Sequence, residues 1–148
     1  MIFDIRDRNL IFVRFDNGDN FYDSLYSVIE KYSIDTGVIL SGMGMLRDFE
    51  IGWFNGKEYE KTKVETPHEL VAMTGNIEKK DGKPFAHIHV ALAGPDKKLV
   101  GGHLFSAIVN VTNEIFIYKI DGFKLERVQK GGWTPLSGKY VDNPKWGE

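Results

Sequence analysis

Residues 84–105, PFAHIHVALAGPDKKLVGGHLF, constrain the fold more than any other part of this chain. His87 and His89 stand two positions apart in an apolar run of β-prone residues, and alternate residues of a strand point to the same face. Residues 94–98 are typical of a turn, because proline fixes φ and aspartate can bond to its own backbone. A second apolar run begins at Leu99. The sequence therefore predicts a β-hairpin with a loop of about five residues.

The register of this hairpin decides whether a third histidine, His103, joins the first two. If the residues at the two ends of the loop pair with each other, His89 lies opposite His103. In the same register, His87 is expected opposite Phe105. Cross-strand partners share a face, with Cβ atoms about 4.5–5.5 Å apart, so all three imidazoles would project from one side of the sheet. A slip of one residue would send His103 to the opposite face.

Three neutral imidazoles that converge on one point suit Zn²⁺, Cu²⁺, Ni²⁺ or Fe²⁺. We expect His87, His89 and His103 to bind a divalent metal ion, with Zn²⁺ as the first candidate. Three protein ligands leave a coordination position for water or a small ligand, and Gly101 and Gly102 are expected to leave room for it. The alternative is a strand with half-buried histidines that bond only to backbone groups.

The sequence leaves open whether such a metal would catalyse a reaction. A metal-dependent hydrolase or lyase also needs a general base. The candidates are Glu69, Glu78, Asp81 and His68, and His68 is also a candidate fourth ligand or a solvent-facing residue. Their spacing places none of them beside the three histidines, so the sequence names no catalytic residue and no reaction.

Composition limits the class of protein. At 148 residues the chain is one domain by size, and the absence of cysteine excludes disulfides and thiolate metal sites. The first residues lack the apolar run of a signal peptide and no apolar run is long enough to span a membrane, so we expect a cytoplasmic protein. Lys and Arg total 19 against 21 Asp and Glu, a net charge of −2, which disfavours binding to duplex DNA.

The pattern along the chain predicts an α+β domain, a mainly antiparallel sheet with one principal helix. The helix is predicted over about 20–32, because apolar residues recur at helical spacing after a capping Asp19 or Asn20. Gly42 and Gly44 favour a bulge or bend. Residues 129–148 lack periodicity, and an irregular tail is expected there, packed on the surface or on a neighbouring subunit. Further strands are predicted at 9–15, 38–40, 49–54, 57–64, 69–77, 107–111, 114–120 and 123–128.

Three motifs resemble the PPC (plant and prokaryote conserved) domain, in the order and spacing of that family, from about residue 9 to residue 128. Residues 37–48, GVILSGMGMLRD, are similar to its glycine-rich signature, and residues 69–77, ELVAMTGNI, to its central strand. The histidine hairpin resembles the hairpin of the family. The resemblance implies that residues 1–128 form a compact α+β domain that assembles as a homotrimer. It also implies metal binding through the matching histidines, His87, His89 and His103.

These expectations leave three functions open. The first is a small metal-binding protein of unassigned activity, with a site that admits water or a small-molecule ligand. The second is a DNA-binding or regulatory protein, as members of the PPC family are often labelled, although this chain lacks the AT-hook segment of the plant members. The third is a trimeric interaction or scaffold module in which a metal ion only stabilises the fold.

Overall fold

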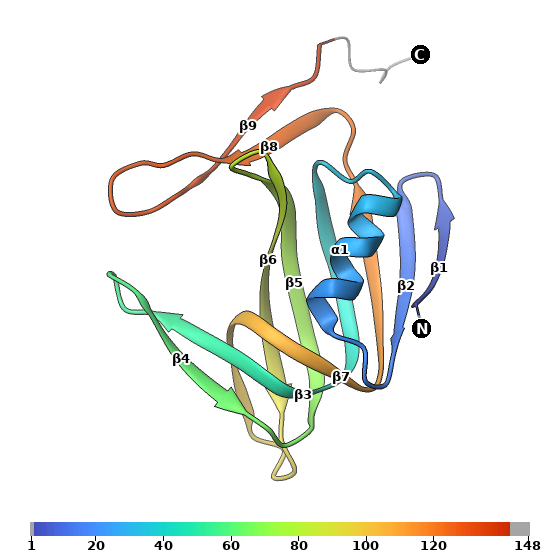
Figure 1. The fold of residues 1–148 in the computed structure, drawn as a ribbon, viewed down its shortest axis with the longest axis vertical. Helices are drawn as coiled ribbons and strands as arrows, with labels where there is room; N and C mark the ends of the chain where they lie inside the picture. The colour runs from blue at the N-terminus through green and yellow to red at the C-terminus, as the bar shows by residue number, and fades with distance from the viewer. Residues whose placement is uncertain (1, 143–148) are drawn as a thin grey trace.

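A computed structural model describes residues 2–142, in which nine strands form a single sheet and one helix lies against it (Figure 1). The pairings are antiparallel except for a short parallel contact between β5 and β8. The predicted α+β class with a mainly antiparallel sheet is confirmed. The elements are β1 (Ile2–Asp7), β2 (Leu10–Asp16), α1 (Phe21–Lys31), β3 (Gly37–Phe54), β4 (Tyr59–Val64), β5 (His68–Lys80), β6 (Lys83–Ala93), β7 (Leu99–Lys119), β8 (Phe123–Arg127) and β9 (Leu136–Tyr140).

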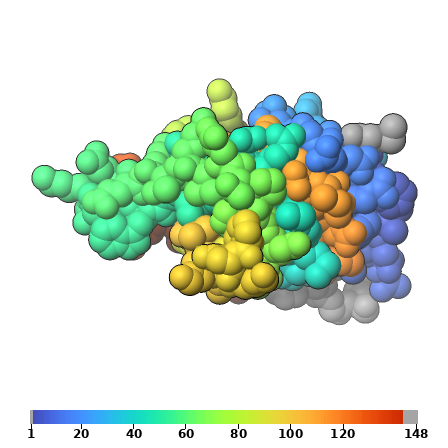
Figure 2. Space-filling model, turned by 90° about the horizontal axis from the view of Figure 1, so that it is seen from below, coloured from blue at the N-terminus to red at the C-terminus, as the bar shows by residue number. Residues whose placement is uncertain are grey.

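The strands follow the order β1-β2-β7-β3-β5-β8-β9, and two further strands attach to this path. β4 pairs with β3, and the β3–β4 hairpin projects from the body of the molecule (Figure 2). β6 pairs with both β5 and β7, while β3 also pairs with both, so these four strands form a closed circuit of pairings. The histidine hairpin belongs to this circuit.

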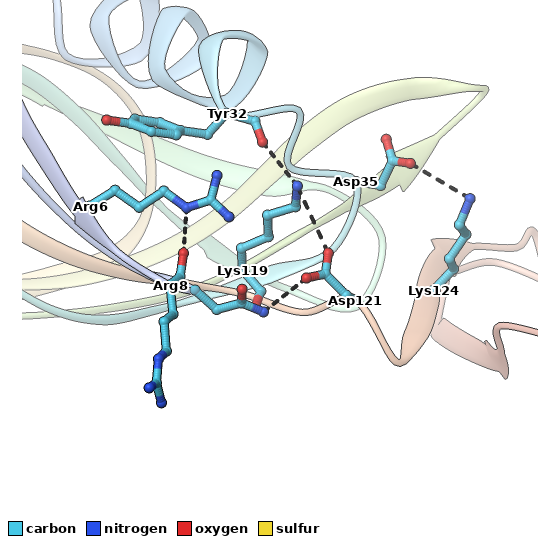
Figure 3. A network of polar contacts seen from close by, with 8 residues as sticks. Arg6, Arg8, Tyr32, Asp35, Lys119, Asp121 and Lys124 are labelled. Atoms are coloured by element: carbon cyan, nitrogen blue, oxygen red, sulfur yellow. Dashed lines mark hydrogen bonds and ion pairs between the residues drawn. The ribbon is translucent and has the colours of Figure 1, made fainter. Parts of the chain in front are cut away.

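Helix α1 begins and ends at recognisable capping groups. The Asn20 side chain accepts a hydrogen bond from the Asp23 backbone N–H at 3.1 Å, which satisfies one of the free donors of the first turn. At the other end, Lys119 Nζ donates to the Tyr32 carbonyl at 3.1 Å and lies 3.8 Å from Asp121 Oδ1 (Figure 3). A cation near the last carbonyls complements the negative end of the helix dipole. The predicted helix and its cap at Asn20 are thus confirmed.

The core lies between α1 and one face of the sheet. Phe21, Leu25 and Ile29 of the helix are almost completely buried, at the spacing of one helical face. Burial of each such side chain contributes about 1.5–3 kcal/mol. The sheet supplies alternate residues to the same core, among them Ile11, Val13, Phe15, Ile39, Ile77, Ile88, Ile115 and Ile117.

β3 and β7 are longer than predicted, because bulges carry each strand across positions where the sequence indicates a break. The register shifts between Gly44 and Met45, as expected for the glycine bulge. Gly44 has φ +135°, and a Cβ there would lie 1.9 Å from the Thr112 carbonyl oxygen, so only glycine fits. On β7, Val111 takes φ +61° and the strand continues through Thr112, where a turn is predicted.

Two elements at the ends of the chain were not expected. β1 was missed because charged residues interrupt its apolar pattern, yet it pairs with β2 along its whole length. The expectation of an irregular tail is wrong for Leu136–Tyr140, which form β9 by pairing with β8. β9 forms through backbone hydrogen bonds to β8. Such pairing requires no hydrophobic periodicity, so no local pattern indicates the strand. The rest of the predicted tail from residue 143 lies outside the described residues.

In the part of the chain that the structure describes, no helix is long and apolar enough to cross a membrane.

Candidate metal centre and the adjoining cavity

The histidine hairpin has the predicted register. Ala93 pairs with Leu99, and His89 lies directly opposite His103. One ring nitrogen from each of His87, His89 and His103 can be chosen so that the three lie within 4.8 Å of one another. We call these residues the histidine trio. All three histidines therefore lie on one face of the sheet, as strand alternation and the parity of the loop predict.

One detail of the predicted hairpin is wrong, since His87 does not lie opposite Phe105. The pairing of β6 with β7 ends at His89 and His103. Beyond that point β7 pairs with β3, where Gly52 lies opposite His103, while β6 continues along β5. β6 and β7 diverge because each follows a second strand, β5 for β6 and β3 for β7. A prediction made from the hairpin alone does not include these outer strands.

Gly101 and Gly102 have a role in strand packing that the sequence did not predict. A Cβ at Gly101 would lie 2.4 Å from the Val90 carbonyl oxygen. A Cβ at Gly102, which has φ +146°, would lie 2.5 Å from the Gly52 carbonyl oxygen. Both glycines therefore let β7 approach its neighbouring strands closely, and the expectation that they make room for a metal's outer ligand stays a prediction.

The rings of the trio lie close together, and two of them are held in the neutral form. His87 Nε2 lies 3.1 Å from His89 Nε2, and the rings of His87 and His103 have centroids 4.8 Å apart. Burial lowers the pKa of His87 to about 4, with the positive charge of Arg127 as the next cause. Burial also lowers the pKa of His103 to about 4, with the neighbouring His87 next. Neutral imidazole is the form that binds metal ions, so neither ring has to lose a positive charge at neutral pH.

Arg127 of β8 contacts the trio through the His87 ring. Its Nη2 donates to His87 Nδ1 at 2.7 Å, its Nε donates to Glu78 Oε1 at 2.7 Å, and its Nη1 donates to the Thr134 carbonyl at 3.2 Å. Glu78 is fully buried, and burial raises its pKa although Arg127 acts in the opposite direction. Sequence reasoning missed Arg127, because it lies 40 residues from His87 and its surroundings form an ordinary strand pattern.

The contact with Arg127 assigns the proton on His87. A guanidinium only donates, so His87 Nδ1 must accept, and the ring proton lies on Nε2, directed at His89 Nε2. For His87 Nε2 to bind a metal ion as a neutral imidazole, the ring proton would have to move to Nδ1, and the contact of Nδ1 with Arg127 would have to open. The donor set fits a divalent ion of borderline softness. His103 also has a buried Nδ1 atom with no hydrogen-bond partner among the described residues, so no hydrogen bond occupies that nitrogen.

The predicted general bases are not assembled around the trio. Glu78 reaches it only through Arg127. His68 is buried elsewhere, where its Nδ1 donates to the Thr66 carbonyl at 2.8 Å and its ring packs edge-on against Phe49. Because a carbonyl only accepts, His68 Nδ1 carries the proton. Glu69 and Asp81 are exposed residues of β5 and of the turn that follows it.

A cavity of about 720 Å³ opens beside the trio, where β6 and β7 separate. His87 and His103 form part of its lining. Two tyrosines of α1 satisfy the backbone groups that the separation leaves unpaired. Tyr22 OH donates to the Leu104 carbonyl at 2.5 Å, and Tyr26 OH accepts from the Ala86 N–H at 3.2 Å. Burial raises the Tyr22 pKa, so its phenol keeps the donated proton.

Comparison with known proteins agrees with this geometry. The model of the Plants and Prokaryotes Conserved (PCC) domain matches residues 6–121. No curated protein sequence matches the chain. A crystal structure of a plant- and prokaryote-conserved protein from Pyrococcus horikoshii is 31% identical with a TM-score of 0.79, covering 92% of this chain and 93% of the other.

Two further solved structures share the fold. A metal-containing protein from Archaeoglobus fulgidus is 35% identical with a TM-score of 0.76, covering 83% of this chain and 87% of the other. A protein from Bacteroides thetaiotaomicron, described as a candidate DNA-binding protein, has a TM-score of 0.85 at 22% identity, covering 95% and 98%. At that identity the likeness shows the fold alone.

Proposed function

Since the chain belongs to the Plants and Prokaryotes Conserved domain family, we propose that it is a small metal-binding protein whose histidine trio holds a divalent ion. Zn²⁺ is the first candidate, because three imidazoles with a free coordination position are typical of catalytic zinc sites. The observation that carries this proposal is the convergence of three ring nitrogens within 4.8 Å on one face of the hairpin. The metal-containing relative from Archaeoglobus fulgidus supports it.

The residues around the trio indicate what the protein itself would contribute. A bound divalent ion can lower the pKa of a water ligand or polarise a carbonyl group. Arg127 holds the His87 ring in one orientation, and Glu78 holds Arg127. Arg127 only donates, so this group does not act as a general base. We therefore propose a metal site with access for a ligand, and assign no reaction to it.

Two other functions have less support. The net charge of −2 offers few phosphate contacts, so duplex DNA would gain little from counterion release. A trimeric module is compatible with the metal site, and we include a homotrimer in the proposal. Several exposed apolar residues lie on the face of β1, β2, β7 and β3 opposite to α1, which suits association with other copies: Phe3, Ile5, Leu10, Leu40, Met43, Phe116 and Tyr118.

The test is metal uptake by untagged protein after removal of metal with a chelator. Titration of Zn²⁺ against a competing indicator should show one tight site per chain, and elemental analysis should confirm the stoichiometry. His89→Ala should reduce the affinity by at least about tenfold, because an imidazole ligand is lost. His68→Asn is the matched control, since His68 lies outside the trio and asparagine keeps a donor near the Thr66 carbonyl. Equal uptake by wild type and His89→Ala would refute the assignment.

A further inference from the structure

The cavity beside the trio has a lining that the metal site does not require. Phenyl, phenol and indole rings from six different parts of the chain line it: Tyr22, Tyr26, Phe54, Tyr59, Phe85, Phe105 and Trp133. Tyr59 meets Phe105 at a centroid distance of 5.0 Å in a T-shaped arrangement, and Phe105 packs 4.3 Å from the His103 ring. A volume of about 720 Å³ lies within the usual range for small-molecule sites. These walls suit a flat aromatic body, which can meet their faces and edges.

The charged groups of the lining are cations. Lys80 and Arg127 contribute to it, and no carboxylate does among the described residues. Lys80 Nζ lies 4.9 Å from the centroid of the Phe85 ring, and it forms no direct ion pair among the described residues, although its charge acts on Glu78. A cation that forms no direct ion pair, placed against an aromatic wall, attracts an anionic group on a ligand that stacks there.

Arg127 adds directed donors to this charge. A guanidinium has five N–H groups, and three of them serve Glu78, His87 and Thr134. Two remain without an acceptor among the described residues. Tyr26 OH accepts from the Ala86 N–H, so its own proton is likewise free to donate within the described part of the chain. The lining therefore combines aromatic walls with unused donors and one cation, Lys80, that forms no direct ion pair among the described residues.

From these features we propose that the cavity binds a small aromatic carboxylate, with its ring between the aromatic walls and its carboxylate toward Lys80 and Arg127. A carboxylate matches the fork of a guanidinium, and a flat ring loses little conformational freedom on binding. The proposal goes beyond metal binding by the trio and does not depend on it, because none of the recognising groups is a member of the trio. Binding should therefore persist in the metal-free protein.

The probe is 2-naphthoate, measured by calorimetry with the chelator-stripped protein and again with Zn²⁺ present. Saturable binding of one molecule per chain is expected in both cases. The neutral analogue 2-naphthalenemethanol keeps the ring and lacks the charge, and cyclohexanecarboxylate keeps the charge and lacks the flat ring. Both should bind more weakly than 2-naphthoate.

Matched variants separate the two parts of the site. Lys80→Gln should weaken 2-naphthoate binding about three- to fivefold and leave 2-naphthalenemethanol unchanged. Lys79→Gln is its control, because Lys79 is the preceding residue, pairs with Asp35 at 3.0 Å and does not line the cavity. Trp133→Ala should weaken binding about two- to tenfold. Trp53→Ala is its control, since both tryptophans are similarly exposed, at 63% and 67%, and only Trp133 lines the cavity.

Three outcomes would overturn the proposal: no saturable binding of 2-naphthoate with or without Zn²⁺, equal affinity for the neutral alcohol, or equal effects of Lys80→Gln and Lys79→Gln. Far-ultraviolet circular dichroism and thermal unfolding of each variant exclude loss of fold as the cause. Zn²⁺ uptake is measured separately. Failure of uptake with intact 2-naphthoate binding would refute the metal proposal alone, and the reverse result would refute the cavity proposal alone.

Discussion

At the scale of single residues, His87 and His103 link protonation to stability. Their pKa values in the folded protein are about 4, against an ordinary value of 6.5, so the unfolded chain binds more protons between these limits. The contribution of these two histidines to the free energy of unfolding is therefore complete above about pH 6.5 and is lost as pH falls toward about 4. We predict that the free energy of unfolding of the metal-free protein, measured with urea, falls by about 2–4 kcal/mol over this window.

The variant His87→Gln/His103→Gln isolates this contribution, because acidic residues also titrate near the lower limit. The pKa of Asp4 is lowered mainly by its hydrogen bond from Lys31, and the pKa of Asp35 mainly by its bond from Lys79. Their contribution is common to both proteins. The double variant should show a flatter pH profile between about pH 6.5 and 4. Parallel profiles for the two proteins would contradict the prediction.

At the scale of elements, one ion pair ties β8 to β5 and to the trio. Arg127 is mostly buried, with 14% of its side chain exposed, and its partner Glu78 is completely buried. Arg127→Ala would leave a buried carboxylate without its counterion, which costs about 3–5 kcal/mol. We predict a destabilisation of this size in denaturant unfolding. The same change removes the donor to His87 Nδ1, so the His87 ring should also become less ordered in nuclear magnetic resonance spectra.

The pair Glu78→Met and Arg127→Met provides the control. Replacing both members of a buried ion pair by apolar residues of similar size is often neutral, whereas removing one is not. The double variant should therefore be more stable than Arg127→Met alone, and a double-mutant cycle should give a favourable coupling energy. Simple addition of the two single effects would show that the pair does not act as a unit.

At the scale of the whole molecule, the sheet has one face covered by α1 and an opposite face with exposed apolar residues. Met43 and Phe116 are 60% and 41% exposed on that uncovered face. Contiguous exposed apolar patches are a common feature of protein–protein interaction sites. We predict a homotrimer, so light scattering should give about three times the chain mass of 16.9 kDa. A mass of one chain would exclude it.

A variant on that face identifies the surface that associates. Met43→Glu places a charge in the proposed contact and should reduce the mass toward that of one chain. Trp53→Glu is the control, because Trp53 is 67% exposed where β3 pairs with β4, and this hairpin projects from the body of the molecule (Figure 2). If Trp53→Glu dissociates the assembly and Met43→Glu does not, the subunits associate through the hairpin instead.

The sequence by itself determined the features that depend on local geometry. Strand alternation placed His87 and His89 on one face, and the parity of the loop at 94–98 brought His103 to the same face. The helical spacing of apolar residues and the cap at Asn20 determined α1. In each case a short segment contains its own signal, because backbone periodicity and turn preference act over a few neighbouring residues.

Only the tertiary structure decided the features that need partners distant in sequence. The separation of β6 from β7 beyond His103 follows from their pairing with β5 and β3, and it opens the cavity. Arg127 reaches His87 across 40 residues, and β9 exists only through pairing with β8. Contacts of this kind depend on which strand edges meet in the folded chain, and no local periodicity encodes that meeting.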